Sequence, residues 1–149
     1  MAETETPTAK KQEKPILPFL RLPEGPGEKP YLAGNKCRQC GTVYLGDRMA
    51  CSRCLSTEPM EELRLSQRGE LHVFSIVHQS APGIPVPYIA AIVDLPEGVS
   101  VRCNIEGVDP DPKNLTFGMP VEMFTEKVHT DREGNEIIAF KFRPVNGGQ

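Results

Sequence analysis

Four cysteines in two close pairs are the residues whose type and spacing point most directly to chemistry. Cys37 and Cys40 form one Cys-x-x-Cys pair, and Cys51 and Cys54 form a second one after ten intervening residues. A chain can turn at this spacing so that both sulfur atoms of a pair point toward one site, and two such turns supply four thiolates. We therefore predict a structural Zn²⁺ held by these four residues. Because a four-cysteine site has no open coordination position, the metal is expected to stabilise structure and not to react with substrate.

Three other uses of the cysteine pairs compete with zinc binding. A disulfide needs an oxidising compartment, whereas the first 14 residues are polar and charged and lack the apolar segment of a secretory signal. A thioredoxin-type redox site uses one pair at the start of a helix in a βαβ unit, a pattern that this sequence does not show. A rubredoxin-like iron site uses the same ligands as zinc, so the sequence leaves the choice between zinc and iron open.

The residues around the pairs predict the local turns and the local charge. Gly41 directly follows the first pair, where the turn favours a residue that tolerates positive φ. Leu55 holds the matching place after the second pair, which predicts a less standard turn there. Four thiolates and one Zn²⁺ carry a net charge of −2. Four cations lie where they can offset it or serve as ordinary solvated surface: Lys36, Arg38, Arg48 and Arg53.

The elements that position the cysteines are expected to be strands. Residues 42–45 read as a strand, 46–47 as a turn and 48–50 as the returning strand, which together predict a rubredoxin-like zinc ribbon. An apolar segment broken by three prolines precedes the ribbon, and we expect it to contact a partner, the alternative being that it packs on this chain's own core. The expected divisions are a disordered tail over 1–15, a partner-contacting arm with a short helix near 28–35 over 16–36, and the ribbon with its connector over 37–68.

Beyond residue 69 the pattern predicts a mostly β fold. Residues 99–106 alternate cleanly between apolar and polar side chains, and Ile138, Phe140 and Phe142 point one way from a last strand. Five strands with a helical turn starting at Asp109 predict an OB-fold barrel over 69–145, followed by a tail over 146–149. The strand from Tyr88 to Leu95 is nearly all apolar, so we expect both of its faces to be covered.

The connection between the first two barrel strands, residues 81–88, is unusually rich in proline. Three prolines within six residues hold it extended and remove backbone donors, so it cannot add to a sheet edge. One interpretation is a loop that shields an edge strand. The other is a preformed apolar surface that lines a substrate channel or contacts a partner. Its residues are Pro82, Ile84, Pro85, Val86, Pro87 and Tyr88.

Charge and hydropathy disfavour two classes of partner. Residues 69–149 carry 6 Lys and Arg against 11 Asp and Glu, whereas a protein that binds a phosphate backbone normally presents a basic face. No apolar run approaches the roughly 20 residues of a membrane-spanning helix. We therefore expect no nucleic acid and no membrane as partners, and a reducing, cytoplasmic setting that suits thiolate ligands.

The remaining nucleophiles and acids do not form a catalytic constellation. Cys103 alternates with apolar residues and is expected to be an inert core residue. The three histidines, His72, His78 and His129, are interpreted as surface residues, and Asp109 and Asp111 as capping residues. We therefore predict that this chain supplies no catalytic residue.

Several separated motifs resemble those of the acyl-CoA-associated zinc-ribbon/OB-fold family. They lie in the same order between about Tyr31 and Val145, although Leu55 stands where the family usually has Gly, and prolines often precede the Arg of the ribbon tip. The matching stretches are Cys37-x-x-Cys40-Gly41, Cys51-x-x-Cys54, Pro85 to Gly98, Gly118-Met119-Pro120-Val121-Glu122 and Phe142-Arg143-Pro144.

The resemblance implies a small accessory subunit that forms a hetero-oligomer with a thiolase-like catalytic subunit and lies against its acyl-CoA channel. It further implies a CoA thioester of aromatic hydrocarbon breakdown as the substrate. Lys36, Arg38 and Arg48 are then candidates for contacts to the CoA phosphates, on charge alone. Two alternatives stay open, a free-standing acyl-CoA-binding protein and a nucleic-acid-binding protein with a zinc ribbon and an OB fold.

Overall fold

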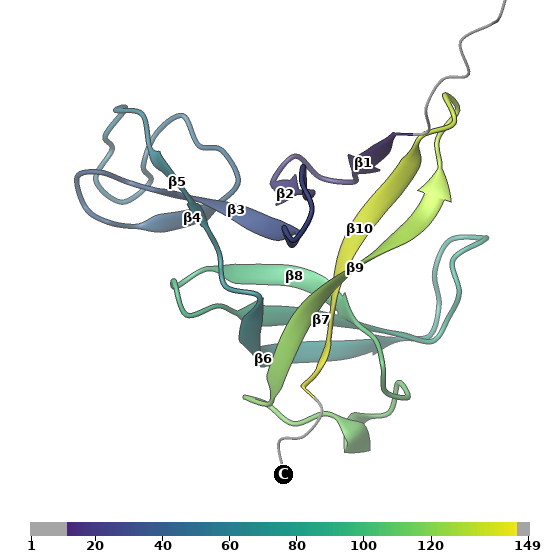
Figure 1. Ribbon diagram of the computed structural model, residues 1–149. Coiled ribbons are helices and arrows are strands. Elements are labelled where there is room, and N and C mark those ends of the chain that lie inside the picture. The colour runs from purple at the N-terminus through teal and green to yellow at the C-terminus, as the bar shows by residue number, and fades with distance from the viewer. Residues whose placement is uncertain (1–11, 146–149) are drawn as a thin grey trace, which may run out of the picture.

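The second half of the chain forms a closed five-stranded barrel. The computed structural model describes residues 12–145. In the larger sheet, β6 pairs with β7 and β9, β7 pairs with β8, and β10 closes the barrel between β8 and β9 (Figure 1). The predicted OB-like barrel is thereby confirmed. Its strands are β6 (Arg68–Val77), β7 (Tyr88–Asp94), β8 (Ser100–Ile105), β9 (Pro120–Thr130) and β10 (Glu136–Pro144).

The alternation of side chains decides which face of each barrel strand is buried. Along β8 the residues alternate strictly between exposed and buried, as the sequence predicted. The inward side chains of β10, including Phe140 and Phe142, are buried as well. The helical turn η1 (Pro112–Asn114) begins two residues later than predicted, because the side chain of Asp111, and not that of Asp109, accepts the capping hydrogen bond from the amide of Lys113.

A smaller sheet carries the cysteines. Strand β3 (Tyr31–Lys36) lies at its centre and pairs with β2 (Leu20–Arg21), β4 (Val43–Leu45) and β5 (Glu61–Arg64). The short helix predicted near 28–35 is therefore wrong, because most of that segment is the central strand of the sheet. The returning strand predicted at 48–50 is also absent from the described chain, since β3 and not residues 48–50 pairs with β4.

The side chain of Asn35 fixes the tip of the β4 hairpin. Asn35 is the one polar residue with a buried side chain in the described chain, and its amide donates to the carbonyl of Gly46 at 2.8 Å and to the carboxylate of Asp47 at 3.2 Å. A buried amide must keep such partners, because an unsatisfied polar group costs about 1–3 kcal/mol. The unusual tip is thus held by hydrogen bonds from the central strand.

The N-terminal segment is more ordered than the sequence suggested. Strand β1 (Glu13–Pro15) pairs in parallel with β10, so the tail predicted for 1–15 does not extend to Pro15. Residues 1–11, and the tail predicted for 146–149, lie outside the described residues. The following apolar segment divides in two: Leu20 is buried in the chain's own core, whereas Ile16 and Leu17 are 45% and 40% exposed.

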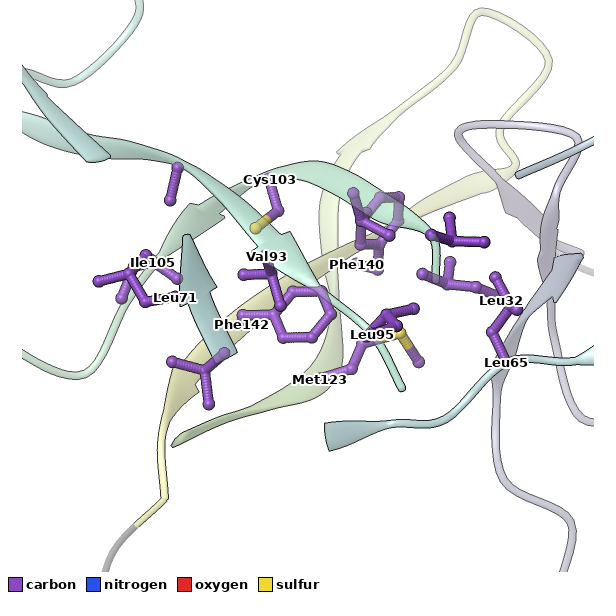
Figure 2. Packing of buried hydrophobic residues seen from close by; sticks show 14 of the residues in the cluster. Leu32, Leu65, Leu71, Val93, Leu95, Cys103, Ile105, Met123, Phe140 and Phe142 are labelled. Carbon is purple, nitrogen blue, oxygen red and sulfur yellow. The ribbon is translucent and has the colours of Figure 1, made fainter. Parts of the chain in front are cut away.

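One continuous core joins the two sheets. Leu32 of β3 and Leu65, which follows β5, lie beside Leu95 and Phe140 of the barrel (Figure 2). The ring centre of Phe19, in the arm, lies 5.9 Å from that of Phe140. This part of the arm therefore packs on the chain's own core, which was the alternative to contact with a partner. The ribbon is therefore anchored to the barrel by buried apolar contacts, which are the main source of stability in folding.

Candidate metal centre

Two turns of the chain bring the four predicted cysteines to one point. All four Sγ atoms lie within 4.8 Å of one another. The Sγ atoms of Cys37 and Cys54 are 3.6 Å apart, and those of Cys40 and Cys51 are 3.5 Å apart. Four sulfur atoms at about 2.3 Å from a tetrahedral zinc would be about 3.8 Å apart, so the donor set fits one metal ion. The predicted metal ligands are thus assembled, although the geometry does not distinguish zinc from iron.

The two turns share one backbone geometry. The amide of Gly41 donates to the carbonyl of Cys37 at 2.9 Å, and the amide of Leu55 donates to that of Cys51 at 2.9 Å. Both residues have positive φ, 79° at Gly41 and 63° at Leu55. A side chain in this left-handed conformation costs about 1–2 kcal/mol, which Leu55 bears while remaining largely exposed. The second turn therefore keeps the geometry of the first, with added strain.

Hydroxyl groups stabilise two of the thiolates. The hydroxyl of Tyr44 lies 3.3 Å from Sγ of Cys51, and its hydrogen bond lowers the pKa of this thiol to about 5. The hydroxyl of Thr42 lies 3.1 Å from Sγ of Cys40 and lowers the pKa of that thiol too. Because the thiolate is the metal-binding form, both contacts favour binding. Sequence reasoning did not assign Tyr44 this role, which depends on how the hairpin folds back over the second turn.

The three predicted phosphate contacts do not share one environment. Lys36 and Arg38 both line a shallow recess beside the first cysteine pair. The guanidinium of Arg48 instead lies over the ring of Tyr44, 4.8 Å from its centre. Their role toward CoA phosphates stays a prediction.

The proline-rich loop lies far from the cysteines. In Figure 1 the ribbon strands lie at the left and the loop between β6 and β7 extends to the right. The ten residues of β6 separate the two, which at 3.3 Å per residue is about 30 Å. Within the loop, Ile84 and Val86 are 49% and 43% exposed. The loop is not extended as predicted, because Gly83 has a φ of 88° and the amide of Ile84 donates to the carbonyl of Ala81 at 3.2 Å, which closes a turn. The fold thus brings the four ligands together but does not bring the loop near Lys36 or Arg38.

The fifth cysteine lies in the barrel core. Cys103 is buried, and burial raises its pKa to about 12. Its Sγ points toward the core beside Val93 (Figure 2). A thiol that stays protonated and has no access to solvent is a poor nucleophile, so the predicted core role of Cys103 is confirmed. His72 lies at a bulge of β6, exposed, with Nδ1 2.8 Å from the carboxylate of Asp94.

The structure shows no helix, among the residues it describes, that is long and apolar enough to cross a membrane. The one helical element of that part of the chain is the three-residue turn η1.

Comparison with known proteins gives the relatives of this chain. The model of a family described as the C-terminal OB-fold domain of ChsH2 matches residues 62–126. A DUF35 domain-containing scaffold protein of Methanothermobacter thermautotrophicus is 38% identical, over 76% of this chain and 86% of that protein. The benzoylsuccinyl-CoA thiolase subunit BbsA of Thauera aromatica is 32% identical, over 93% and 96%.

A solved structure agrees with these sequence relatives. The structure described as an Ltp2-ChsH2(DUF35) aldolase superposes with a TM-score of 0.59 at 25% identity, covering 76% of this chain and 84% of that one. The sequence similarity to scaffold proteins and to a thiolase subunit extends over both the cysteine-bearing sheet and the barrel. This agrees with the family resemblance that the sequence motifs indicated. This chain belongs to the DUF35 family of OB-fold proteins.

Proposed function

We propose that this chain is a non-catalytic subunit that binds a structural Zn²⁺ and docks on a thiolase-type catalytic subunit. The observation that carries the proposal is the kinship, over nearly the whole chain, to the benzoylsuccinyl-CoA thiolase subunit BbsA of Thauera aromatica and of Geobacter metallireducens. The relation to one chain of an aldolase assembly supports the same kind of role. On the analogy of BbsA, the substrate is benzoylsuccinyl-CoA or a related aromatic CoA thioester.

The cysteine chemistry of the described chain fits a supporting role. Thiolysis needs an activated cysteine nucleophile and an acid or base beside it. Four of the cysteines face one another as a closed donor set, and Cys103 is buried with a raised pKa. The reacting groups would then come from the catalytic subunit, while this chain positions the thioester and excludes water.

The acyl-CoA channel is the finer part of the proposal. The proline-rich loop presents Ile84 and Val86 to solvent beside a hydrogen-bonded turn, which suits a wall for an acyl or pantetheine chain. Lys36 and Arg38 would contact CoA phosphates at a separate place, next to the metal. Since about 30 Å of β6 lies between the two, they contact different parts of the ligand or different ligands.

Co-purification tests the proposal directly. The full-length chain is tagged, recovered from its native extract, and the proteins that accompany it in fixed stoichiometry are identified by mass spectrometry. We expect a thiolase- or aldolase-type subunit, and about one zinc per chain by elemental analysis. Iron in place of zinc would correct the metal. Thioester cleavage or condensation by the isolated chain would refute the non-catalytic role, and tight acyl-CoA binding without a partner would favour a free-standing acyl-CoA-binding protein.

The loop has its own test in the assembled enzyme. Replacing Pro85 and Pro87 by Gly removes the restraint on the loop and should lower kcat/KM several-fold, while the metal content stays as in the wild type. Because both changes raise the entropy of the unfolded chain, thermal unfolding should shift down by a few degrees only. Unchanged kinetics would reduce the loop to a spacer.

A further inference from the structure

The outward side chains of three adjacent barrel strands form one surface, which we call the β6–β8 outer face. The strand register places Val73 beside Ile92 and Ile92 beside Arg102, and it places Ala90 between Ser75 and Asn104. These rows continue along the sheet toward the proline-rich loop. The face consists of Val73, Ser75, Val77, Tyr88, Ala90, Ile92, Asp94, Ser100, Arg102 and Asn104. Its one carboxylate, Asp94, accepts a hydrogen bond from the hydroxyl of Ser100 at 2.7 Å and lies 2.8 Å from Nδ1 of His72.

The central strand of this face is mostly apolar on a side that the described chain covers only in part. Along β7 buried residues alternate with half-buried ones, and the half-buried set is Tyr88, Ala90 and Ile92, followed by Asp94 at the end of the strand. Beside Ile92, the side chain of Val73 is 42% exposed. The sequence predicted cover on both faces of this strand, and only the inner face is fully covered. A partly uncovered apolar strip in the middle of a sheet marks a surface that another protein covers.

The charge at the edge of the strip identifies the chemistry of that protein. Arg102 is exposed on β8, and no carboxylate of the described residues pairs with it. The cations of β9 and β10 are different, because Lys127, Lys141 and Arg143 each pair with a glutamate of this chain. An Arg left free beside an apolar strip, in a half of the chain with net charge −5, complements a partner surface that is apolar with a carboxylate at its edge.

We infer that the β6–β8 outer face is a docking surface for the catalytic subunit, which covers Val73 and Ile92 with apolar side chains and pairs a carboxylate with Arg102. This inference rests on the proposed function and adds the location of the contact. A large apolar residue at the centre and a charged one at the edge is the usual anatomy of a specific interface.

Affinity measurements with matched controls test the inference. The chain is first shown to co-purify with a subunit identified as thiolase- or aldolase-type, and the dissociation constant of the purified pair is then measured. Arg102→Glu is compared with Arg132→Glu, a second exposed arginine in the β9–β10 turn, and Val73→Asp is compared with Val128→Asp, whose side chain is 39% exposed on β9. Metal content and thermal unfolding establish that all four variants are folded.

Each outcome decides one point. Arg102→Glu and Val73→Asp should each weaken binding at least tenfold, the two controls less than threefold, and Arg102→Gln should reduce the dependence of the dissociation constant on salt. If the wild type binds the subunit and all variants bind equally well, the docking surface is elsewhere and the proposed function survives. If no such subunit accompanies the wild type, the proposed function fails and this inference with it. A homodimer of the isolated chain that Arg102→Glu dissociates would reassign the face to a second copy and overturn the inference.

Discussion

Replacing Leu32 by Ala tests whether the metal-binding sheet and the barrel are one folding unit. Leu32 is 1% exposed and lies in the core cluster that the two sheets share. Removing a fully buried leucine side chain loses its transfer free energy and leaves a cavity, which together cost about 2–5 kcal/mol. The site lies between two sheets that can close partly around a void, so we expect a loss of about 3 kcal/mol in the free energy of unfolding.

That loss converts to a measurable shift in the melting temperature. For a chain of this length each kcal/mol lowers the melting temperature by about 2–4 °C, so the variant should melt about 6–12 °C below the wild type. The control is Leu17→Ala, because Leu17 has the same side chain but is 40% exposed. It should cost less than about 1 kcal/mol.

Two probes separate a shared core from two independent modules. Circular dichroism follows the β structure, and a colorimetric chelator follows metal release during the same thermal ramp. If the core is continuous, the two transitions coincide in the wild type and move together in the variant. Metal release at a lower temperature with an unchanged barrel transition would refute the reasoning, since it would mean that Leu32 stabilises only the cysteine-bearing sheet.

Three further predictions concern other parts of the chain. Cys37→Ser should lose the metal by elemental analysis and abolish complex formation, because metal-binding free energy is folding free energy in such sites; an intact complex without metal would contradict this. Gly69→Ala should destabilise the chain by about 2 kcal/mol in urea unfolding, since its Cβ would lie 2.6 Å from the backbone oxygen of Asp94. Burial opposes protonation of Lys141, but hydrogen bonds to two glutamates outweigh it and raise its pKa above 10.5. Its contribution to stability is therefore complete below pH 10.5 and is lost as pH rises through the higher pKa of the folded state, so wild type and Lys141→Met should converge in stability only above that pKa.

Local chemistry made the clustering of the four cysteines predictable from the sequence. A Cys-x-x-Cys pair fixes the approach of its two sulfurs within one turn, and two pairs need only one hairpin to meet. The buried faces of β8 and β10 were equally predictable from the sequence, because in a strand with one buried face every second side chain is apolar. Each of these features depends on neighbours in sequence.

The features that sequence reasoning missed depend on partners far along the chain. The local sequence of β3 does not predict a strand, because Gly34 and Asn35 both have low strand propensity. The structure explains both residues: a Cβ at Gly34 would lie 2.7 Å from the side chain of Leu65, and Asn35 binds the hairpin tip 11 residues away. The role of Tyr44 beside Cys51 and the packing of Leu20 likewise arise only when segments distant in sequence meet.

The position of the four cysteines suggests how a metal bound there could affect the distant β6–β8 outer face. Strand β3 ends at Lys36, directly before Cys37, and β5 is paired along it and leads through Leu65 into β6. Leu32 and Leu65 are buried together with barrel residues, so the strands next to the metal are held in the same core as β7 and β8. Closely packed interiors transmit displacement, because they have few voids to absorb it. Under the proposed function, loss of a bound metal is therefore expected to weaken docking at the β6–β8 outer face indirectly, through the shared core.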